Sequence, residues 1–262
     1  MSYTFISGAT GGIGKAFAIE CAKLGYNLYL TGRSKDKLET LKGELLGINK
    51  DLLIYTFQCD LTCEKERKDL VDFAISNNLT FNRIINVAGI DTQKAFTDYT
   101  REKVLGQLRV NIEATTDLTY MLLNLKEDNL EVITISSMSG QSPMPYFALY
   151  SASKQYLTNL FTSLHYELKD KGVKVTAVLP GGVYTRPDIV EEIKSQGVWG
   201  KLSAKSPEFI AKKSLRAVRK NKVKYIPGFF NKLLNFFMAI LPKPIVLRFI
   251  ARRWKKHTKD AF

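Results

Sequence analysis

The chain has 262 residues, of which 45% are hydrophobic and 24% charged, and this composition excludes a disordered protein. Its formal net charge of +14 arises near the C-terminus, because from Lys201 onward 17 basic residues oppose only Glu208 and Asp260. Three cysteines without zinc-ligand spacing favour reduced thiols, so we expect a cytoplasmic protein. A strand-like segment directly follows Met1, and we therefore expect no signal peptide.

Apolar runs alternate with segments of helical periodicity along most of the chain. The runs predict strands near residues 4–7, 27–31, 52–57, 83–86, 132–136, 173–179 and 224–226. Helices are predicted near residues 12–24, 35–46, 64–77, 101–125 and 147–171. This alternation, with strands apolar on both faces, predicts a doubly wound α/β fold, a Rossmann-like parallel sheet of about seven strands with helices on both faces.

A glycine-rich turn separates the first strand from the first helix. It reads Ser7-Gly8-Ala9-Thr10-Gly11-Gly12-Ile13-Gly14. Glycines at this place allow the backbone to approach a pyrophosphate held at a helix N-terminus. The alternative is a turn that packs the helix closely against the sheet.

No acidic residue follows the second strand, which ends in Thr31-Gly32-Arg33-Ser34. A site that selects NAD presents Asp or Glu to the ribose 2′-hydroxyl, whereas a guanidinium suits the 2′-phosphate of NADP. Arg33 therefore favours NADP over NAD. Alternatively, Arg33 is a solvated residue beside the start of a helix.

A serine, a tyrosine and a lysine follow the predicted strand at residues 132–136. Ser137 ends the strand, a loop with Gly140, Pro143 and Pro145 follows, and Tyr150 and Lys154 then share one helix face. A hydroxyl that faces a phenol with a nearby ammonium is suited to moving a proton, and the ammonium is expected to lower the pKa of the phenol. A Tyr/Lys pair on a solvated helix face is the alternative.

With these motifs in this order, the chain resembles a member of the short-chain dehydrogenase/reductase family, in its compact single-domain branch. Ser7 replaces a threonine of the family's glycine motif, and Val87 departs from its Asn-Asn-Ala-Gly motif. The resemblance implies the catalytic residues Asn111, Ser137, Tyr150 and Lys154. It implies cofactor contacts from Gly8, Thr10, Gly11, Gly12, Ile13, Gly14, Arg33, Ser34, Asp60, Leu61, Asn86, Ala88, Gly89, Tyr150, Lys154, Pro180, Gly181, Val183 and Thr185.

The resemblance also implies a mechanism of hydride transfer between nicotinamide and a carbonyl carbon. Tyr150 would be the general acid, with Ser137 hydrogen-bonded to the same oxygen. Lys154 would hold the nicotinamide ribose, and Asn111 would hold a water that links Lys154 to solvent. A non-catalytic NADP-bound sensor or scaffold is the alternative; the presence of all four catalytic residues argues against it, and the glycine spacing disfavours an epimerase of the extended branch.

The resemblance also implies that two segments contact the substrate. The loop before Tyr150 contains Met138, Met144, Pro145, Tyr146 and Phe147, and residues 188–205 contain Ile189, Val190, Ile193, Val198 and Trp199. An apolar lining favours a hydrophobic substrate such as a hydroxysteroid, a 3-oxoacyl thioester or a lipid ketone. Alternatively, these residues pack the lid, about residues 185–205, onto the body. His165 and His257 have no convincing partners, and no group of residues predicts a metal site.

Residues 229–262 form a basic, amphipathic extension beyond the catalytic domain predicted at residues 1–228. The apolar run at residues 236–241 is too short to span a membrane, and Pro242 and Pro244 divide the extension into two short helices. It is either a peripheral anchor on anionic lipid or a lid or subunit contact; nucleic acid is disfavoured. By resemblance, the helices at 101–125 and 147–171 pair across a two-fold axis in a homodimer or homotetramer.

Overall fold

A parallel sheet of seven strands forms the centre of the computed structural model, which describes residues 1–185, 187–195, 197–255 and 259–260. The strand order is β3-β2-β1-β4-β6-β7-β8, and every neighbouring pair is parallel. In chain order the strands are β1 (Ser2–Ser7), β2 (Asn27–Gly32), β3 (Ile54–Gln58), β4 (Thr80–Asn86), β6 (Lys126–Ile135), β7 (Val173–Val178) and β8 (Lys224–Tyr225). The predicted doubly wound fold is confirmed.

Helices cover both faces of the sheet because each strand is apolar on both sides. In β1, Phe5 points to one face and Ile6 to the other, and both are fully buried. The Ile6 face is covered by α1 (Gly12–Lys23), α2 (Lys35–Ile48) and α9 (Pro207–Arg219). The Phe5 face is covered by α3 (Glu64–Ser76), α5 (Thr115–Leu123) and α6 (Ala148–Glu167).

The helix predicted at residues 101–125 is interrupted. It begins as α4 (Arg101–Leu108), widens into a π-helical turn at Arg109–Ala114 and continues as α5. A wide turn of this kind is rare and often lies at a functional site. The predicted catalytic Asn111 lies within it.

Helix α9 was absent from the predicted elements. Its start carries clear sequence signals: Ser206 caps the helix by accepting a hydrogen bond from the Phe209 amide, and Pro207 occupies the first turn. Its buried residues follow helical spacing, from Ile210 through Ser214 to Val218. The same capping and periodicity criteria therefore find this helix once they are applied to the segment after the lid.

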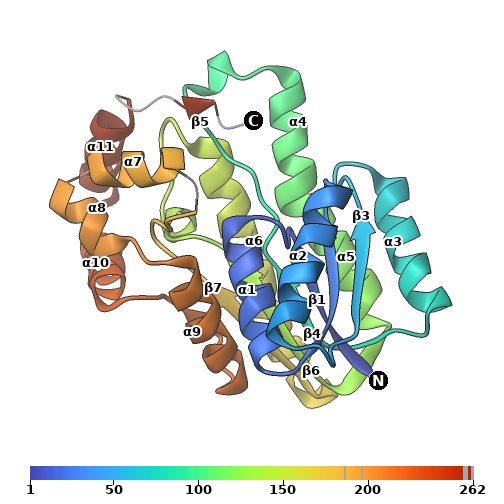
Figure 1. Ribbon diagram of the computed structural model, residues 1–262. Coiled ribbons are helices and arrows are strands. Elements are labelled where there is room, and N and C mark those ends of the chain that lie inside the picture. The colour runs from blue at the N-terminus through green and yellow to red at the C-terminus, as the bar shows by residue number, and fades with distance from the viewer. Residues whose placement is uncertain (186, 196, 256–258, 261–262) are drawn as a thin grey trace.

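The remaining helices gather on one side of the molecule, opposite the edge strand β3 (Figure 1). They are α7 (Pro187–Ser195), α8 (Gly197–Ser203), α10 (Phe229–Ile240) and α11 (Lys243–Trp254). Pro242 separates α10 from α11, as the sequence predicted. A small antiparallel pair joins β5 (Thr92–Gln93) to β9 (Lys259–Asp260). Among the described helices, none has the length and hydropathy to cross a bilayer.

Candidate active site

A large cleft lies at the carboxyl ends of the strands, where parallel sheets of this type bind their ligands. Its volume of about 1930 Å³ exceeds that of an ordinary small-molecule pocket, so there is room for a dinucleotide and a substrate. Of the predicted site residues, the cleft is lined by Gly8, Thr10, Gly11, Gly12, Ile13, Gly14, Arg33, Asp60, Leu61, Ala88, Gly89, Ser137, Tyr150, Lys154, Pro180, Gly181, Val183 and Thr185. Ser34, Asn86 and Asn111 are not part of this lining.

The backbone of the glycine turn is shaped so that Gly8, Gly12 and Gly14 have little or no room for a side chain. Gly8 has a φ of +65°, in the left-handed region, and a Cβ built on Gly14 would lie 2.1 Å from the Gly8 carbonyl oxygen. A Cβ on Gly12 would lie 2.9 Å from Cβ of Thr185. The turn therefore packs tightly, as the alternative interpretation expected, and also opens the N-terminus of α1 onto the cleft. An exposed helix N-terminus of this kind suits a pyrophosphate.

The hydroxyl of Ser7 joins the ends of β1 and β4. Its Oγ accepts hydrogen bonds from the amides of Val87 and Ala88, at 3.1 and 3.3 Å. Serine has the same hydroxyl as the threonine of the family motif. This hydroxyl fixes Val87 and Ala88, which line the cleft at the point where the strand order reverses.

Two basic residues follow β2. Arg33 and Lys37 both line the cleft at exposed positions, while Ser34 caps α2 by accepting a hydrogen bond from the Lys37 amide at 3.3 Å. The sequence reasoning found Arg33 but missed Lys37, although the position of Lys37 in the first turn of a predicted helix could have placed it there. Among the described residues that line the cleft directly after β2, two are cations and none is a carboxylate, which fits a 2′-phosphate.

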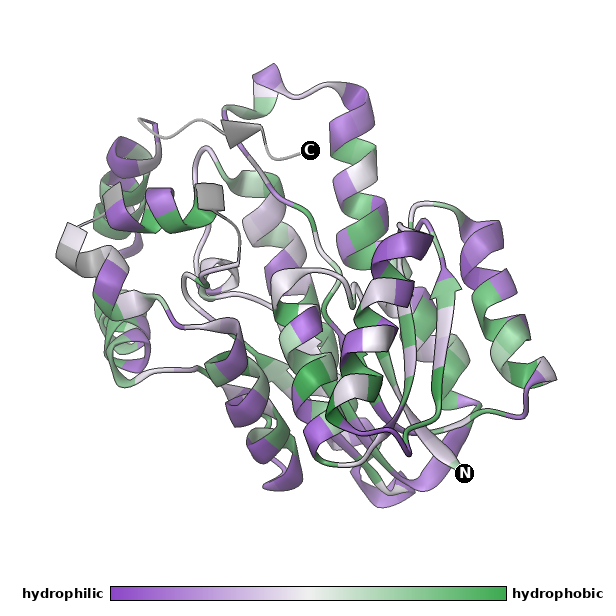
Figure 2. Cartoon of the chain, viewed as in Figure 1, coloured by the Kyte–Doolittle hydropathy of each residue, from purple (hydrophilic) through white to green (hydrophobic). Residues whose placement is uncertain are grey.

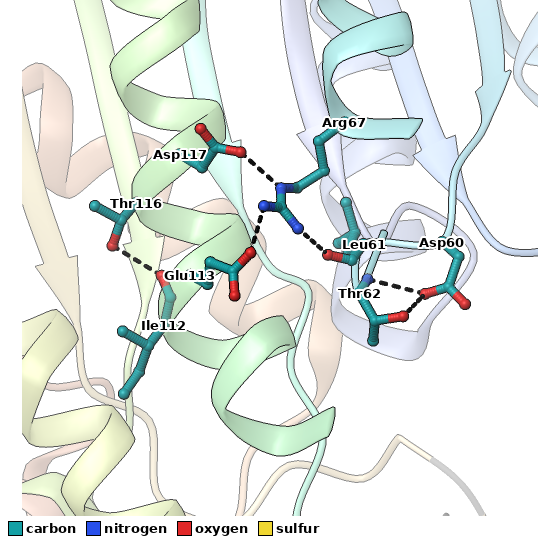
Figure 3. A network of polar contacts seen from close by, with 8 residues as sticks. All are labelled: Asp60, Leu61, Thr62, Arg67, Ile112, Glu113, Thr116 and Asp117. Carbon is teal, nitrogen blue, oxygen red and sulfur yellow. Dashed lines mark hydrogen bonds and ion pairs between the residues drawn. The ribbon is translucent and has the colours of Figure 1, made fainter. Parts of the chain in front are cut away.

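Asp60 lies on the loop after β3, beside a network of buried charge (Figure 3). Its carboxylate accepts hydrogen bonds from the amide and hydroxyl of Thr62, both at 2.9 Å. The carbonyl oxygen of the next residue, Leu61, accepts a hydrogen bond from the buried guanidinium of Arg67 at 2.9 Å. Arg67 also forms ion pairs with Glu113 at 2.5 Å and with Asp117 at 2.7 Å. This arginine, which the sequence reasoning missed, thus joins the loop that carries Asp60 to the π turn.

The two predicted asparagines are buried behind the cleft wall. The amide nitrogen of Asn86 donates to the hydroxyls of Thr119 and Thr134, and so joins β4 to α5 and β6. Asn111 accepts from the Ile90 amide at 2.8 Å and donates to the Ile90 carbonyl at 2.9 Å and to Oγ of Ser153 at 3.1 Å. Both polar atoms of Asn111 are therefore engaged with protein groups, which gives its side chain a positioning role.

Ser137, Tyr150 and Lys154 meet at the inner end of the cleft. Ser137 caps a short 3₁₀ turn at Met138–Gln141, where its hydroxyl oxygen accepts hydrogen bonds from the amide and hydroxyl of Ser139. Nζ of Lys154 donates to the Ile135 carbonyl at 2.9 Å and lies 5.6 Å from the centre of the Tyr150 ring. The strand end and the first turns of α6 thus bring the predicted hydroxyl, phenol and ammonium together.

The pKa of Tyr150 is raised, and the expectation that Lys154 lowers it is wrong for this structure. Burial is the main cause; Asp91 raises the pKa further, and a hydrogen-bonding contact with Ser137 lowers it. Burial also lowers the pKa of Lys154 to about 8, against an opposing effect of Asp91. The loss of solvation at Tyr150 therefore raises the pKa of the phenol by more than the contact with Ser137 lowers it, so the phenol keeps its proton. Asp91, which lines the cleft, was not predicted.

The C-terminal helices form one wall of the cleft. The ring of Tyr150 stacks on Phe147 with centroids 4.5 Å apart, and Phe147 stacks on Trp254 of α11 at 5.5 Å. Met144 and Phe147 form a buried cluster with Val246 and Ile250. From the lid, Ile189 lines the cleft and Ile193 is buried, whereas the side chains of Val198 and Trp199 lie outside the described part of the chain. The predicted substrate loop therefore faces an apolar wall.

His165 and Cys21 lie outside the cleft lining, whereas Cys59 belongs to the lining but is fully buried. His165 is buried, and its Nδ1 lies 2.7 Å from the carbonyl of Val175. Burial raises the pKa of the Cys21 and Cys59 thiols to about 12, so both stay protonated. Among the described residues, no group of His, Cys, Asp and Glu could hold a metal ion; His257 lies outside them.

Comparisons with known proteins agree with this architecture. A family model described as short chain dehydrogenase matches residues 2–196. A very-long-chain 3-oxoacyl-CoA reductase from Anas platyrhynchos is 32% identical over 196 residues, which are 71% of this chain and 61% of that protein. An 11-beta-hydroxysteroid dehydrogenase-like 3 protein from Arabidopsis thaliana is 32% identical over 197 residues, 72% of this chain and 62% of that protein. The chain thus spans about three fifths of these relatives.

A solved 7beta-hydroxysteroid dehydrogenase structure has a TM-score of 0.85 and is 25% identical; the match covers 95% of this chain and 96% of that one. The family model alone covers well over half of the chain, and the order of the motifs along the sequence agrees with it. The predicted resemblance is confirmed. The chain belongs to the short-chain dehydrogenase family.

Proposed function

We propose that this protein is an NADP-dependent oxidoreductase that interconverts a ketone and a secondary alcohol on a hydrophobic substrate. The observation that carries the proposal is the position of Tyr150, a protonated phenol that faces Ser137 at the end of an apolar wall. The names of the relatives support a 3-oxoacyl or hydroxysteroid substrate.

In the direction of reduction, the chain's own residues position the carbonyl and supply the proton. NADPH, when bound, supplies the hydride. The Ser137 hydroxyl donates a hydrogen bond to the carbonyl oxygen, and Tyr150 gives its proton to that oxygen as negative charge develops. Lys154, fixed by the Ile135 carbonyl, would hold the ribose hydroxyls of the bound cofactor. Asn111 fixes the Ile90 segment and so the wall next to Lys154.

The preference for NADP rests on Arg33 and Lys37, which present two cations at the end of β2. A phosphate there gains charge-assisted hydrogen bonds, whereas a bare ribose hydroxyl does not.

The main competing function is a sensor or scaffold that binds NADP without turnover. The burial of Lys154 and Asn111 argues against the sensor, because burying polar and charged groups costs free energy and a binding module does not require it.

One assay separates the two functions. Purified protein is mixed with NADPH or, in parallel, NADH and a panel of lipophilic ketones, and oxidation of the cofactor is followed by absorbance. We expect turnover with NADPH, a weaker rate with NADH, and loss of at least a hundredfold in kcat for Tyr150→Phe with NADPH affinity nearly unchanged. Turnover by Tyr150→Phe at the rate of the unaltered protein would refute the role of Tyr150. NADPH binding without turnover on any ketone would favour the sensor.

We further propose that the protein is a homodimer or homotetramer and that α10 and α11 make peripheral contact with a membrane. For the first, α5 and α6 present the exposed side chains of Tyr120 and Tyr156. For the second, α10 and α11 carry exposed apolar side chains, among them Phe229 and Phe249.

A further inference from the structure

The outer face of the two C-terminal helices is apolar and uncovered. Eight of the 18 exposed large hydrophobic side chains in the described part of the chain lie on α10, on α11 or on the turn between them. We call this set the outer apolar face: Phe229, Leu233, Phe236, Phe237, Ile240, Leu241, Ile245 and Phe249. Phe229 is 80% exposed and Phe249 64%. So many neighbouring hydrophobic groups mark a docking surface, and α10 is coloured mostly as hydrophobic in Figure 2.

Cations surround this face, and acids are missing from it. Lys232, Lys243, Arg248 and Arg252 are exposed on or beside the two helices. No acidic residue occurs in the sequence between Glu208 and Asp260. The surface that covers the outer apolar face must therefore accept hydrocarbon in its middle and positive charge at its rim.

A second copy of the chain fits this requirement poorly. Two-fold pairing through the outer apolar face would bring the same cations of both copies together, because such an interface is formed by one patch on each subunit. Like charges brought together at an interface repel each other and weaken the association. An anionic lipid surface supplies hydrocarbon beneath negative headgroups, and these headgroups attract basic residues that lie near them.

The two helices have the dimensions of interfacial elements. Each has 12 residues and is about 18 Å long, well short of the roughly 30 Å hydrocarbon core. A short helix with aromatic and aliphatic side chains on one face and cations at its edges lies in the plane of the headgroups. The outer apolar face would enter the acyl boundary while the cations stay at the headgroups.

The outer apolar face continues into the cleft that contains Tyr150. Phe237, Leu241, Ile245 and Phe249 are exposed and also line the cleft. Further inward, Met238, Val246 and Ile250 line the same cleft and pack toward Phe147. An apolar path therefore runs from the outside of α10 and α11 to the ring that stacks on Tyr150.

We propose that α10 and α11 dock this protein onto an anionic lipid bilayer and that the substrate cleft opens at the docked surface, so that a lipophilic substrate passes from the bilayer to Tyr150 without crossing water. The docking step stands on the outer apolar face and its cations alone. The delivery step rests on the proposed function, because it requires a lipophilic ketone or alcohol as substrate.

Vesicle sedimentation tests the docking step without any turnover. The full-length protein is mixed with vesicles of phosphatidylcholine alone or with added phosphatidylserine, and the bound fraction is measured. We expect binding to the anionic vesicles that is at least about tenfold stronger than to the neutral ones and that weakens as salt rises. The Phe236→Gln/Ile240→Gln variant, whose substitutions lie outside the cleft, should lose at least about tenfold in binding.

A matched control variant is Leu24→Gln/Ile75→Gln, which removes exposed hydrophobic side chains from α3 and the end of α1. It should bind vesicles as the unaltered protein does. The docking step is overturned if the unaltered protein stays in the supernatant with anionic vesicles, or if Phe236→Gln/Ile240→Gln binds equally well. A fall in molar mass of that variant by light scattering without lipid would also overturn it, because the face would then join copies of the chain.

The delivery step is tested by comparing two ketones. A short water-soluble ketone should be reduced equally by the unaltered protein and by Phe236→Gln/Ile240→Gln. A long-chain ketone supplied in anionic vesicles should be reduced at least about fivefold more slowly by the variant. Equal rates on the vesicle-borne ketone would overturn delivery. If neither ketone is reduced by the unaltered protein, the proposed function fails while sedimentation still decides the docking step.

Discussion

Tyr150 and Lys154 lie one turn apart on α6, and burial opposes the charged form of both. The phenol therefore holds its proton more firmly than in water, which suits a donor to a developing alkoxide. The ammonium holds its proton less firmly, with a pKa of about 8 in place of 10.5. The unfolded chain therefore binds more protons than the folded protein between these values, so the contribution of Lys154 to stability rises as pH rises through that window.

This shift predicts how activity depends on pH. Protonated Lys154 attracts the anionic cofactor, so kcat/KM for NADPH should be flat at low pH and fall above about pH 8. Asp91 raises the pKa of Lys154, and Asp91→Asn should therefore move the fall in kcat/KM to lower pH. Steady-state kinetics from pH 6 to 10 measure both curves.

Asp98→Asn serves as the control, because Asp98 is exposed on a nearby 3₁₀ turn and is not part of the cleft lining. It should leave the pH profile unchanged. If Asp91→Asn and Asp98→Asn both give the pH profile of the unaltered protein, the negative charge of Asp91 does not set the pKa of Lys154.

At the scale of elements, periodicity predicted the sheet and its main helices because each strand and helix buries a face whose spacing is visible in the sequence. The π turn at Arg109–Ala114 was not visible in this way. It depends on contacts between residues distant in sequence, such as Asn111 with Ile90 and Arg67 with Glu113. The sequence alone does not distinguish Arg67 from the other charged residues of α3. Its role depends on the packing of α3 against α5, which brings it to Glu113 and Asp117.

Arg67 joins the loop that carries Asp60 to the π turn, so its loss should weaken cofactor binding more than it slows the chemical step. In Arg67→Met the Leu61 carbonyl loses its donor, and the loop that carries Asp60 is freed. We expect the Kd for NADPH to rise about tenfold, or about 1.4 kcal/mol, with kcat at saturating NADPH within about twofold. Calorimetric titration and saturation kinetics measure the two quantities.

Lys65→Met on the same helix is the matched control, because it removes only the exposed pair with Asp69. Such a pair contributes little, so Kd and kcat should stay unchanged. Arg67→Lys should recover part of the affinity through its charge. Lower thermal stability in Arg67→Met with an unaltered Kd for NADPH would show that the network only holds the fold.

At the scale of the molecule, the sequence left open whether residues 229–262 are a lid or an anchor, because both helices carry apolar side chains with cations beside them. The structure resolves part of this ambiguity: Val246, Ile250 and Trp254 on one side of α11 line the cleft, whereas Ile245 and Phe249 on a neighbouring side are exposed. The two apolar sides of α11 therefore need different coverings. Single-sequence periodicity identifies neither covering, because the partner of each face lies far away in the chain or outside it.

We propose that the surface of α5 and α6 joins the subunits, because it carries two exposed tyrosine side chains. Oγ1 of Thr116 lies 3.2 Å from the hydroxyl of Tyr156, which joins the two helices into one face, and Tyr120 on that face is 72% exposed. Aromatic side chains such as tyrosine are enriched at protein–protein interfaces.

We therefore expect Tyr120→Glu/Tyr156→Glu to convert the assembly to monomers, because four like charges would meet across a two-fold axis. Light scattering coupled to gel filtration measures the mass. Ile48→Glu, at the exposed end of α2, is the control and should keep the mass of the unaltered protein. Vesicle binding by the monomeric variant should persist, since the outer apolar face is untouched. A variant with full oligomer mass would show that this face does not join the subunits.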